Sequence, residues 1–241
     1  MAIAALIAVS VAGIATGAKP VTVEAGNLVV TVNGEFKPAK LPKNKLAPIS
    51  LFVSGKIATK DGTHIPAVKE VLVETDKNGT INVKGLPKCK SGQLQARTTS
   101  AAEAACKKAI IGNGQTTAEV EFPEQGKINV PSKLIVFNGG FSGGTTTLYI
   151  HAYFSAPVSG ALVTTLKIKK INNGRYGLLT KATIPKLAGG FGSIKSFNLK
   201  IDKKGVLMAK CPDGKIQAKA TSIFSDGTKA TAPIIRTCTG T

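Results

Sequence analysis

Histidine chemistry in this chain depends on two residues, because His64 and His151 supply its only imidazole groups. His64 follows a turn that carries Asp61, and a nearby carboxylate can orient an imidazole as a general base requires. No nucleophile stands at an informative spacing from this pair. His151 lies within an apolar run of strand character, where a packed or surface-facing residue is the ordinary interpretation. We therefore predict no catalytic residue; the alternative is a secreted hydrolase that uses His64 with acids brought together by the fold.

The sequence contains no recognisable motif for other types of reaction. The glycine-rich run 189–193 does not match the Gly-x-Ser-x-Gly nucleophile elbow, and the run 139–144 lacks the Lys-Ser/Thr sequel of a phosphate-binding loop. No two cysteines have Cys-x-x-Cys spacing, and the sequence holds no calcium loop of the Asp-x-Asp kind. Glu119 and Glu121 share one face of an expected strand, which we interpret as solvated. The sequence therefore predicts no cofactor and no metal site.

Lysine dominates the charge of the chain. The formal net charge is +19, and 29 of the 32 basic residues are lysines. Residues 133–241 hold 16 basic and three acidic residues, whereas residues 19–132 hold 16 and ten. Such a surface attracts polyanions. We predict contact with an anionic cell-wall polymer or polysaccharide through six residues of the second region: Lys167, Lys169, Lys170, Arg175, Lys203 and Lys204.

Two alternatives to this charge-based prediction stay open. A lysine-coated surface can serve solubility alone. Nucleic acid is the second alternative, and it is the weaker one because bases stack on aromatic side chains. The chain has three tyrosines, Tyr149, Tyr153 and Tyr176, and no tryptophan.

A repeated segment indicates how the chain is organised. Residues 89–100, CKSGQLQARTTS, reappear 122 positions later as CPDGKIQAKATS, and residues 68–79 match residues 194–205 at an offset of 126. Self-similarity of this kind indicates that one unit has been duplicated. We therefore predict two units, residues 19–132 and residues 133–241.

The repeat also pairs the four cysteines. An even number of cysteines in an exported chain favours disulfides. Cys89 and Cys211 occupy equivalent places, and each has one downstream partner within its own unit. The predicted disulfides are therefore Cys89–Cys106 and Cys211–Cys238, and each stabilises its unit by about 3 kcal/mol in the chain-entropy model.

Turn signals separate many short runs that have strand character. Asn-Gly or Asp-Gly occurs eight times, and both dipeptides suit the positive φ angles of hairpin turns. Several runs alternate apolar and polar residues, as half-buried strands do. One short helix is expected near 101–110, because Ser100 and Glu103 form a capping box and Gly112 ends the run. The predicted fold is all-β, with two tandem related β-sandwich units, immunoglobulin-like or jelly-roll-like, and one short helix.

Export is predicted from the first residues. Residues 1–18 are uncharged, consist almost wholly of small and aliphatic residues, and end as a signal cleavage site does. A membrane anchor is the alternative, although the stretch is short and weakly apolar for a span of about 20 residues. Since no other stretch could cross a bilayer, no transmembrane segment remains after signal removal. We expect a secreted or cell-surface protein.

Four short segments carry a resemblance to known proteins: residues 41–45 (LPKNK), 53–63 (VSGKIATKDGT), 85–90 (GLPKCK) and 189–193 (GGFGS). They resemble an uncharacterised family of secreted bacterial β-rich proteins of similar length, over most of residues 40–241. The resemblance implies secretion and a β-rich structure but no activity. Together with the charge, it leads us to expect a non-catalytic binding or structural module at the cell surface or outside the cell.

Overall fold

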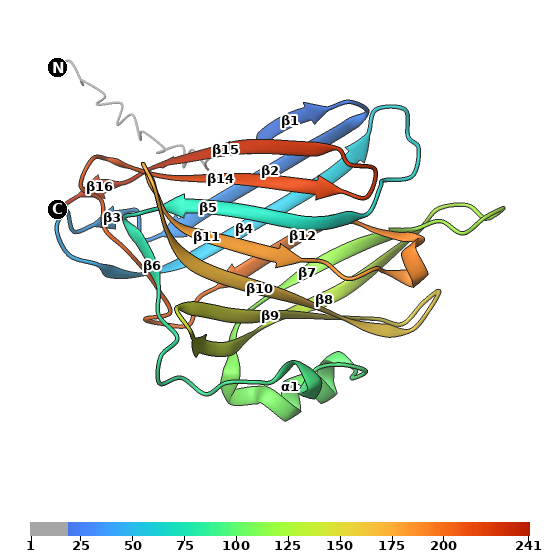
Figure 1. Ribbon diagram of the computed structural model, residues 1–241, viewed down its shortest axis with the longest axis horizontal. Helices are drawn as coiled ribbons and strands as arrows, with labels where there is room; N and C mark the ends of the chain where they lie inside the picture. The colour runs from blue at the N-terminus through green and yellow to red at the C-terminus, as the bar shows by residue number, and fades with distance from the viewer. Residues whose placement is uncertain (1–18) are drawn as a thin grey trace, which may run out of the picture.

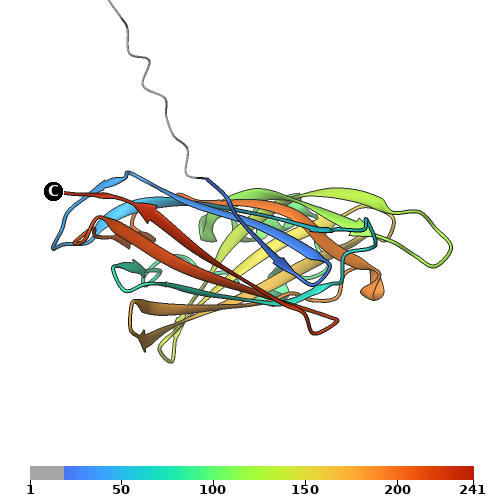
Figure 2. The ribbon, with the colours of Figure 1, turned by 90° about the horizontal axis from the view of Figure 1, so that it is seen from above.

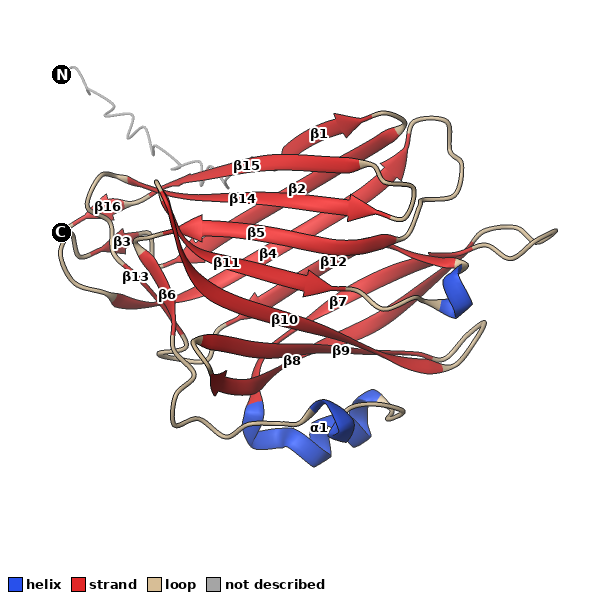
Figure 3. Ribbon diagram, viewed as in Figure 1, coloured by secondary structure: helices blue, strands red, loops and turns tan. Residues whose placement is uncertain are grey.

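A computed structural model describes residues 19–241, so the predicted signal peptide lies outside the described residues. The described chain forms sixteen strands, the helix α1 (Thr99–Cys106) and three short 3-10 helices, η1 (Ser91–Gln93), η2 (Lys107–Ala109) and η3 (Ala188–Gly190) (Figure 3). The predicted all-β class with one short α-helix is confirmed. Within residues 19–241, no helix is long and apolar enough to cross a bilayer.

Twelve strands follow one another in a single antiparallel sheet (Figure 1). Their order is β1 (Val21–Ala25), β2 (Leu28–Lys37), β4 (Ala47–Thr59), β12 (Gly192–Ile201), β7 (Ile110–Val120), β8 (Ile128–Ser142), β9 (Thr145–Phe154), β10 (Gly160–Asn173), β11 (Tyr176–Thr183), β5 (Val68–Asp76), β14 (Lys215–Phe224) and β15 (Lys229–Thr237). The short strands β6 (Gly79–Ile81) and β13 (Leu207–Ala209) pair with each other, and β13 also pairs with β4. A separate parallel pair joins β3 (Lys40–Leu41) to β16 (Thr239–Gly240).

The sheet curves until it nearly closes. In Figure 1, β14, β5, β11 and β10 lie in front of β2, β4 and β12, and Figure 2 shows the same strands from above. Arg236 of β15 reaches across the remaining gap between the first and last strands. Its Nε donates to the Gly34 carbonyl of β2 at 2.6 Å, and its Nη2 donates to the Lys19 carbonyl at 3.2 Å.

Apolar side chains fill the space that the curved sheet encloses. The largest core cluster includes Leu134 of β8, Leu162 of β10 and Leu199 of β12. A second cluster joins Val30 of β2 to Phe224 of β14, which lie on facing parts of the sheet. Burial of these side chains is the main force that holds the two faces together.

Each predicted unit contributes one strand to the other unit's part of the sheet. β12 lies between β4 and β7, whereas β5 lies between β11 and β14. The link 60–67 leads the chain from β4 to β5 in the other half of the sheet, and the link 184–191 leads it from β11 to β12. Two tandem sandwich units are therefore not confirmed, because each half of the sheet takes a central strand from the other half of the chain. Alternation of apolar and polar residues predicts strands but does not identify their neighbours.

The strand order is nevertheless the same in both halves of the sheet. One half reads β1-β2-β4-β12-β7-β8, and the other reads β9-β10-β11-β5-β14-β15. In each half of the sheet, a hairpin and a third strand are followed by one strand from the other half of the chain and then by a second hairpin. The exchanged strands, β5 and β12, are the segments that the offset of 126 residues matches in the sequence.

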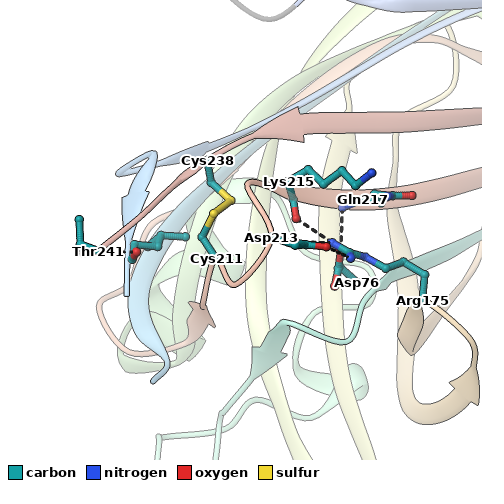
Figure 4. The surroundings of a disulfide bond; sticks show 9 residues. Asp76, Arg175, Cys211, Asp213, Lys215, Gln217, Cys238 and Thr241 are labelled. Atoms are coloured by element: carbon teal, nitrogen blue, oxygen red, sulfur yellow. Dashed lines mark hydrogen bonds and ion pairs between the residues drawn. A yellow bond between two sulfur atoms is a disulfide. The ribbon is translucent and has the colours of Figure 1, made fainter. Parts of the chain in front are cut away.

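Both predicted disulfides are present. The Cα atoms of Cys89 and Cys106 are 5.6 Å apart, and those of Cys211 and Cys238 are 6.1 Å apart. All four cysteines are buried. The first disulfide closes the segment that carries α1, and the second ties the residues before β14 to the end of β15 (Figure 4).

The segment 89–109 does not form the strand that its match in the second half of the chain forms. Residues 93–98 form no strand, although the matching residues 215–220 belong to β14. Leu94 is instead buried against Ile135 and Phe137 of β8, so the segment covers the outside of the sheet. α1 begins earlier than predicted, because Thr98 and not Ser100 caps it.

Candidate functional site

Three of the predicted polymer contacts lie together on β10. Lys167, Lys169 and Lys170 are exposed, and no ion pair within residues 19–241 involves them. Lys167 is directly opposite Lys181 of β11, which adds a fourth ammonium group to this part of the sheet, although Lys181 is itself paired with Glu70. Lys204, after β12, is exposed as well. These lysines are accessible to an anionic partner, and their contact with one stays a prediction.

Arg175 and Lys203, by contrast, are engaged within the molecule. Arg175 Nε donates to the buried carboxylate of Asp76 at 2.6 Å, and its Nη1 donates to Asp213 (Figure 4). These bonds, first that to Asp213, raise the pKa of Arg175. Lys203 Nζ donates to the Lys108 carbonyl at 3.0 Å. We therefore assign both side chains to the fold and not to a polymer-binding surface.

Replacing Arg175 by glutamine is expected to lower the free energy of unfolding by about 2 kcal/mol, because buried Asp76 would lose its charged partner. The backbone N–H groups of Asn78 and Gln217 would remain as its donors. Urea unfolding measures the change. The matched control, Lys204→Gln, alters an exposed side chain and should stay within about 0.5 kcal/mol of wild type. Equal stability of the two variants would show that the Arg175 pair contributes nothing.

The fold brings His64 next to Glu119 of β7 and Glu121, which follows that strand. His64 Nδ1 lies 3.2 Å from Glu119 Oε1 and 3.5 Å from Glu121 Oε2. The prediction that this face is solvated is wrong for Glu119. Its side chain is 3% exposed because the link between β4 and β5 covers it. Asp61 has other partners: hydrogen bonds from the Asn27 side chain and from the loop backbone lower its pKa to about 2.

Structural partners occupy both oxygens of Glu119. Lys195 Nζ of β12 lies 3.0 Å from Oε2, and the Ile65 N–H donates to Oε1 at 3.4 Å. Burial raises the pKa of Glu119, but these two partners and the Lys127 ammonium outweigh burial and leave the pKa below its usual value. Ser193, opposite Glu119 on β12, is 2% exposed, and its hydroxyl donates to the Ile65 carbonyl. The cluster fastens the link between β4 and β5 to the sheet, which accounts for it without a catalytic role.

Glu119→Gln is expected to destabilise the protein by about 2 kcal/mol near neutral pH, because Lys195 would lose a charged acceptor. Since the folded-state pKa of Glu119 is lowered, its charge stabilises the fold above the ordinary pKa of a glutamate. That stabilisation is lost as the pH falls through the lowered pKa. The difference in melting temperature between wild type and variant should therefore shrink between about pH 7 and pH 3.

A matched control for this variant is Glu124→Gln, which alters an exposed loop carboxylate. Its melting temperature should follow that of wild type at every pH. A Glu119→Gln difference that grows in acid would contradict the assignment of a stabilising charge to Glu119.

His151 is packed beneath the segment that carries α1, which is one of the two positions expected for it. It is fully buried, and its Nε2 lies 3.0 Å from the Arg97 carbonyl, so Nε2 carries the proton. Its Nδ1 has no hydrogen-bond partner among the described residues. Burial lowers the pKa of His151 and favours the neutral ring. We therefore assign His151 to packing.

A row of polar side chains crosses the outer face of five strands. Asn33 of β2 is opposite Ser54 of β4, which is opposite Asn198 of β12. Asn198 is in turn opposite Gln115 of β7, and Gln115 is opposite Lys133 of β8. Directly opposite residues of neighbouring strands share one face of a sheet, so these five side chains form one line, the amide row.

The core lies on the other side of these strands. Val53, Leu199 and Leu134 each adjoin a member of the amide row in sequence, and all three contribute to the largest core cluster. Because successive side chains of a strand point to opposite faces, the amide row faces outward.

A shallow groove of about 790 Å³ follows the amide row where it crosses β12, β7 and β8. Its polar lining includes Asn113, Gln115, Thr117, Lys133 and Asn198. The amide groups of Asn113, Gln115 and Asn198 form no hydrogen bond with another described side chain or backbone group, so they are open to a ligand. The groove can supply neutral donors and acceptors together with one ammonium group.

The sequence contains a partial signal for this groove. In residues 112–117, GNGQTT, the long polar side chains of Asn113 and Gln115 alternate with glycines, as on a half-exposed strand. Nothing in that pattern places Asn198 beside Gln115, because the two residues are brought together by the exchange of β12. Comparison of the chain with protein-family models, with curated proteins and with solved structures finds no match.

Proposed function

We propose that the protein is a secreted or cell-surface, non-catalytic module that binds an anionic polymer. The unequal pairing of its charges supports this proposal most strongly. Within residues 19–241, nine of the 13 acidic side chains lie within ion-pair distance of a basic group, whereas seven of the 29 lysines do so with an acid. Most of the positive charge is therefore free to attract an external polyanion.

Two further features support an extracellular role. Disulfides persist in oxidising compartments and are rare in the cytosol, and both disulfides here are buried in the fold. Lysine meets anionic groups as a hydrated point charge and has no planar fork for a specific phosphate geometry. This chemistry suits a polymer with many carboxylates or phosphates.

Binding to immobilised polyphosphate and polygalacturonate tests the proposal. The mature chain, residues 19–241, should be retained at low salt and released as salt rises, because the bound charges release counterions. A variant with Lys167, Lys169 and Lys170 changed to glutamine should elute at a lower salt concentration. A mature chain that passes both columns at low salt would refute the proposal.

We also propose that the chain arose by duplication of one unit that then exchanged a strand with its copy. The matching strand orders of the two halves support this, as does the place of the matched segments β5 and β12 in them. The copies differ at the α1-bearing segment: the sequence match aligns it with β14, whereas in the strand order β14 takes the place of β7. The outer faces differ too, with lysines on β10 and β11 and amides on β12 and β7.

A further inference from the structure

We propose that the amide row binds an acidic polysaccharide whose chain lies across the strands. This inference rests on the proposed function and names its ligand class and its site. The groove along β12, β7 and β8 would hold the central sugars.

The spacing of the row suits such a chain. Neighbouring strands lie about 4.8 Å apart, a distance comparable to the length of one hexose in an extended polysaccharide. Asn198, Gln115 and Lys133 stand on three successive strands, with Ser54 on the next, whereas Asn33 at the end of the row is already bonded to Glu35 and Arg236. A chain that crosses the strands would therefore meet about one polar side chain per sugar.

The side-chain chemistry suits hydroxyl groups. An amide offers two N–H donors and a carbonyl acceptor, and a sugar hydroxyl both donates and accepts. Asn113, Gln115 and Asn198 keep these groups free of internal partners. A ligand that carries charge but no hydroxyls would leave most of these amide donors and acceptors without a partner.

Lysines beside the row suit carboxylates. Lys56 on β4 and Lys200 on β12 each lie two residues from a member of the row and therefore on the same face. Lys200 is paired with Asp202 at 2.7 Å and Lys133 with Glu103 at 2.8 Å, and both lysine side chains are more than half exposed. Exposed ion pairs contribute little, so these ammonium groups can turn to a ligand at small cost.

An aromatic side chain lies beside the same face. Phe52 is directly opposite Lys200 and remains 39% exposed. A second hollow, of about 220 Å³, is lined by Phe52, Lys200 and Glu35. The exposed ring offers an apolar surface to the carbon face of a sugar, so the site would extend from the groove toward β4.

The backbone holds the site in place before binding. The row stands on paired strands, and the buried Thr116 hydroxyl donates to the Ser196 carbonyl at 2.8 Å, which ties β7 to β12. Because the strands are already held in place, ligand binding would cost little conformational entropy, which favours affinity.

Isothermal titration with two probes tests the inference: an oligogalacturonate, which has hydroxyls and carboxylates, and an inorganic polyphosphate of similar charge. The row variant changes Asn113, Gln115 and Asn198 to alanine. The matched control changes Lys167, Lys169 and Lys170 to glutamine. Melting curves check that both variants fold.

The row variant should bind oligogalacturonate at least tenfold more weakly than wild type and should keep its affinity for polyphosphate. The lysine control should weaken both probes to a similar extent. Equal oligogalacturonate affinity of wild type and row variant, or no oligogalacturonate binding by wild type, would overturn the inference and leave the proposed function standing if polyphosphate still bound. Failure of wild type to bind either probe would overturn both.

Discussion

Separated between β7 and β8, the two halves of the chain should each fail to fold and should fold together when they are mixed. Residues 19–125 lack β12, which fills the place between β4 and β7, and their β5 would have neither of its neighbours. Residues 126–241 lack β5 in the same way. A sheet with a missing central strand leaves backbone groups unpaired and core side chains exposed. Circular dichroism and urea unfolding should show no cooperative transition for either fragment and one transition for the mixture.

A nicked chain is the matched control for this experiment. A protease site placed at residues 124–126 can be cut after folding, because that loop is exposed. The nicked protein should keep its cooperative transition, which would separate the effect of the cut from that of the missing strand. A fragment 19–125 that unfolds cooperatively alone would show that the exchange of strands is not required.

Gly114→Ala should cost about 3 kcal/mol of unfolding free energy. A Cβ atom at Gly114 would lie 2.0 Å from the Asn198 carbonyl oxygen and 2.9 Å from Leu199 Cα. Both obstacles are backbone atoms of β12, so relief requires that β7 and the exchanged strand move apart. Overpacking of this kind costs about 1–3 kcal/mol and occasionally more. Urea midpoints compared at constant m-value measure the change.

Gly126→Ala is the control for this substitution. Gly126 lies in the exposed loop between β7 and β8, and an added Cβ would meet no atom within 4 Å. Its stability should stay within about 0.5 kcal/mol of wild type. If the two variants unfolded at the same urea concentration, the close approach of β7 and β12 would be wrong.

Local patterns in the sequence predict much of this fold. Alternating apolar residues and Asn-Gly turns identify an all-β chain because a strand has a period of two. The repeat pairs Cys89 with Cys106 and Cys211 with Cys238, because each pair is local to one half of the chain. These local patterns do not predict which strands are neighbours, because that depends on where the links 60–67 and 184–191 lead the chain.

The roles of individual charged residues follow from those non-local contacts. Arg175 has the sequence features of a free surface charge, and its two carboxylate partners come from β5 and from the turn before β14. Glu119 has the sequence features of a residue on a solvated face, but in the folded protein the link after β4 covers it. The amide row needs five strands in register, so sequence patterns locate its members but not their alignment.

Backbone amide shifts during titration with an oligogalacturonate test the central claim most directly, because they show which strands meet the ligand. The largest changes are predicted for residues 113–117 of β7, 131–133 of β8 and 196–200 of β12. Smaller, salt-sensitive changes are expected at Lys167 and Lys169. Changes confined to the lysines of β10 and β11, or spread evenly over the surface, would contradict a polysaccharide site on the amide row.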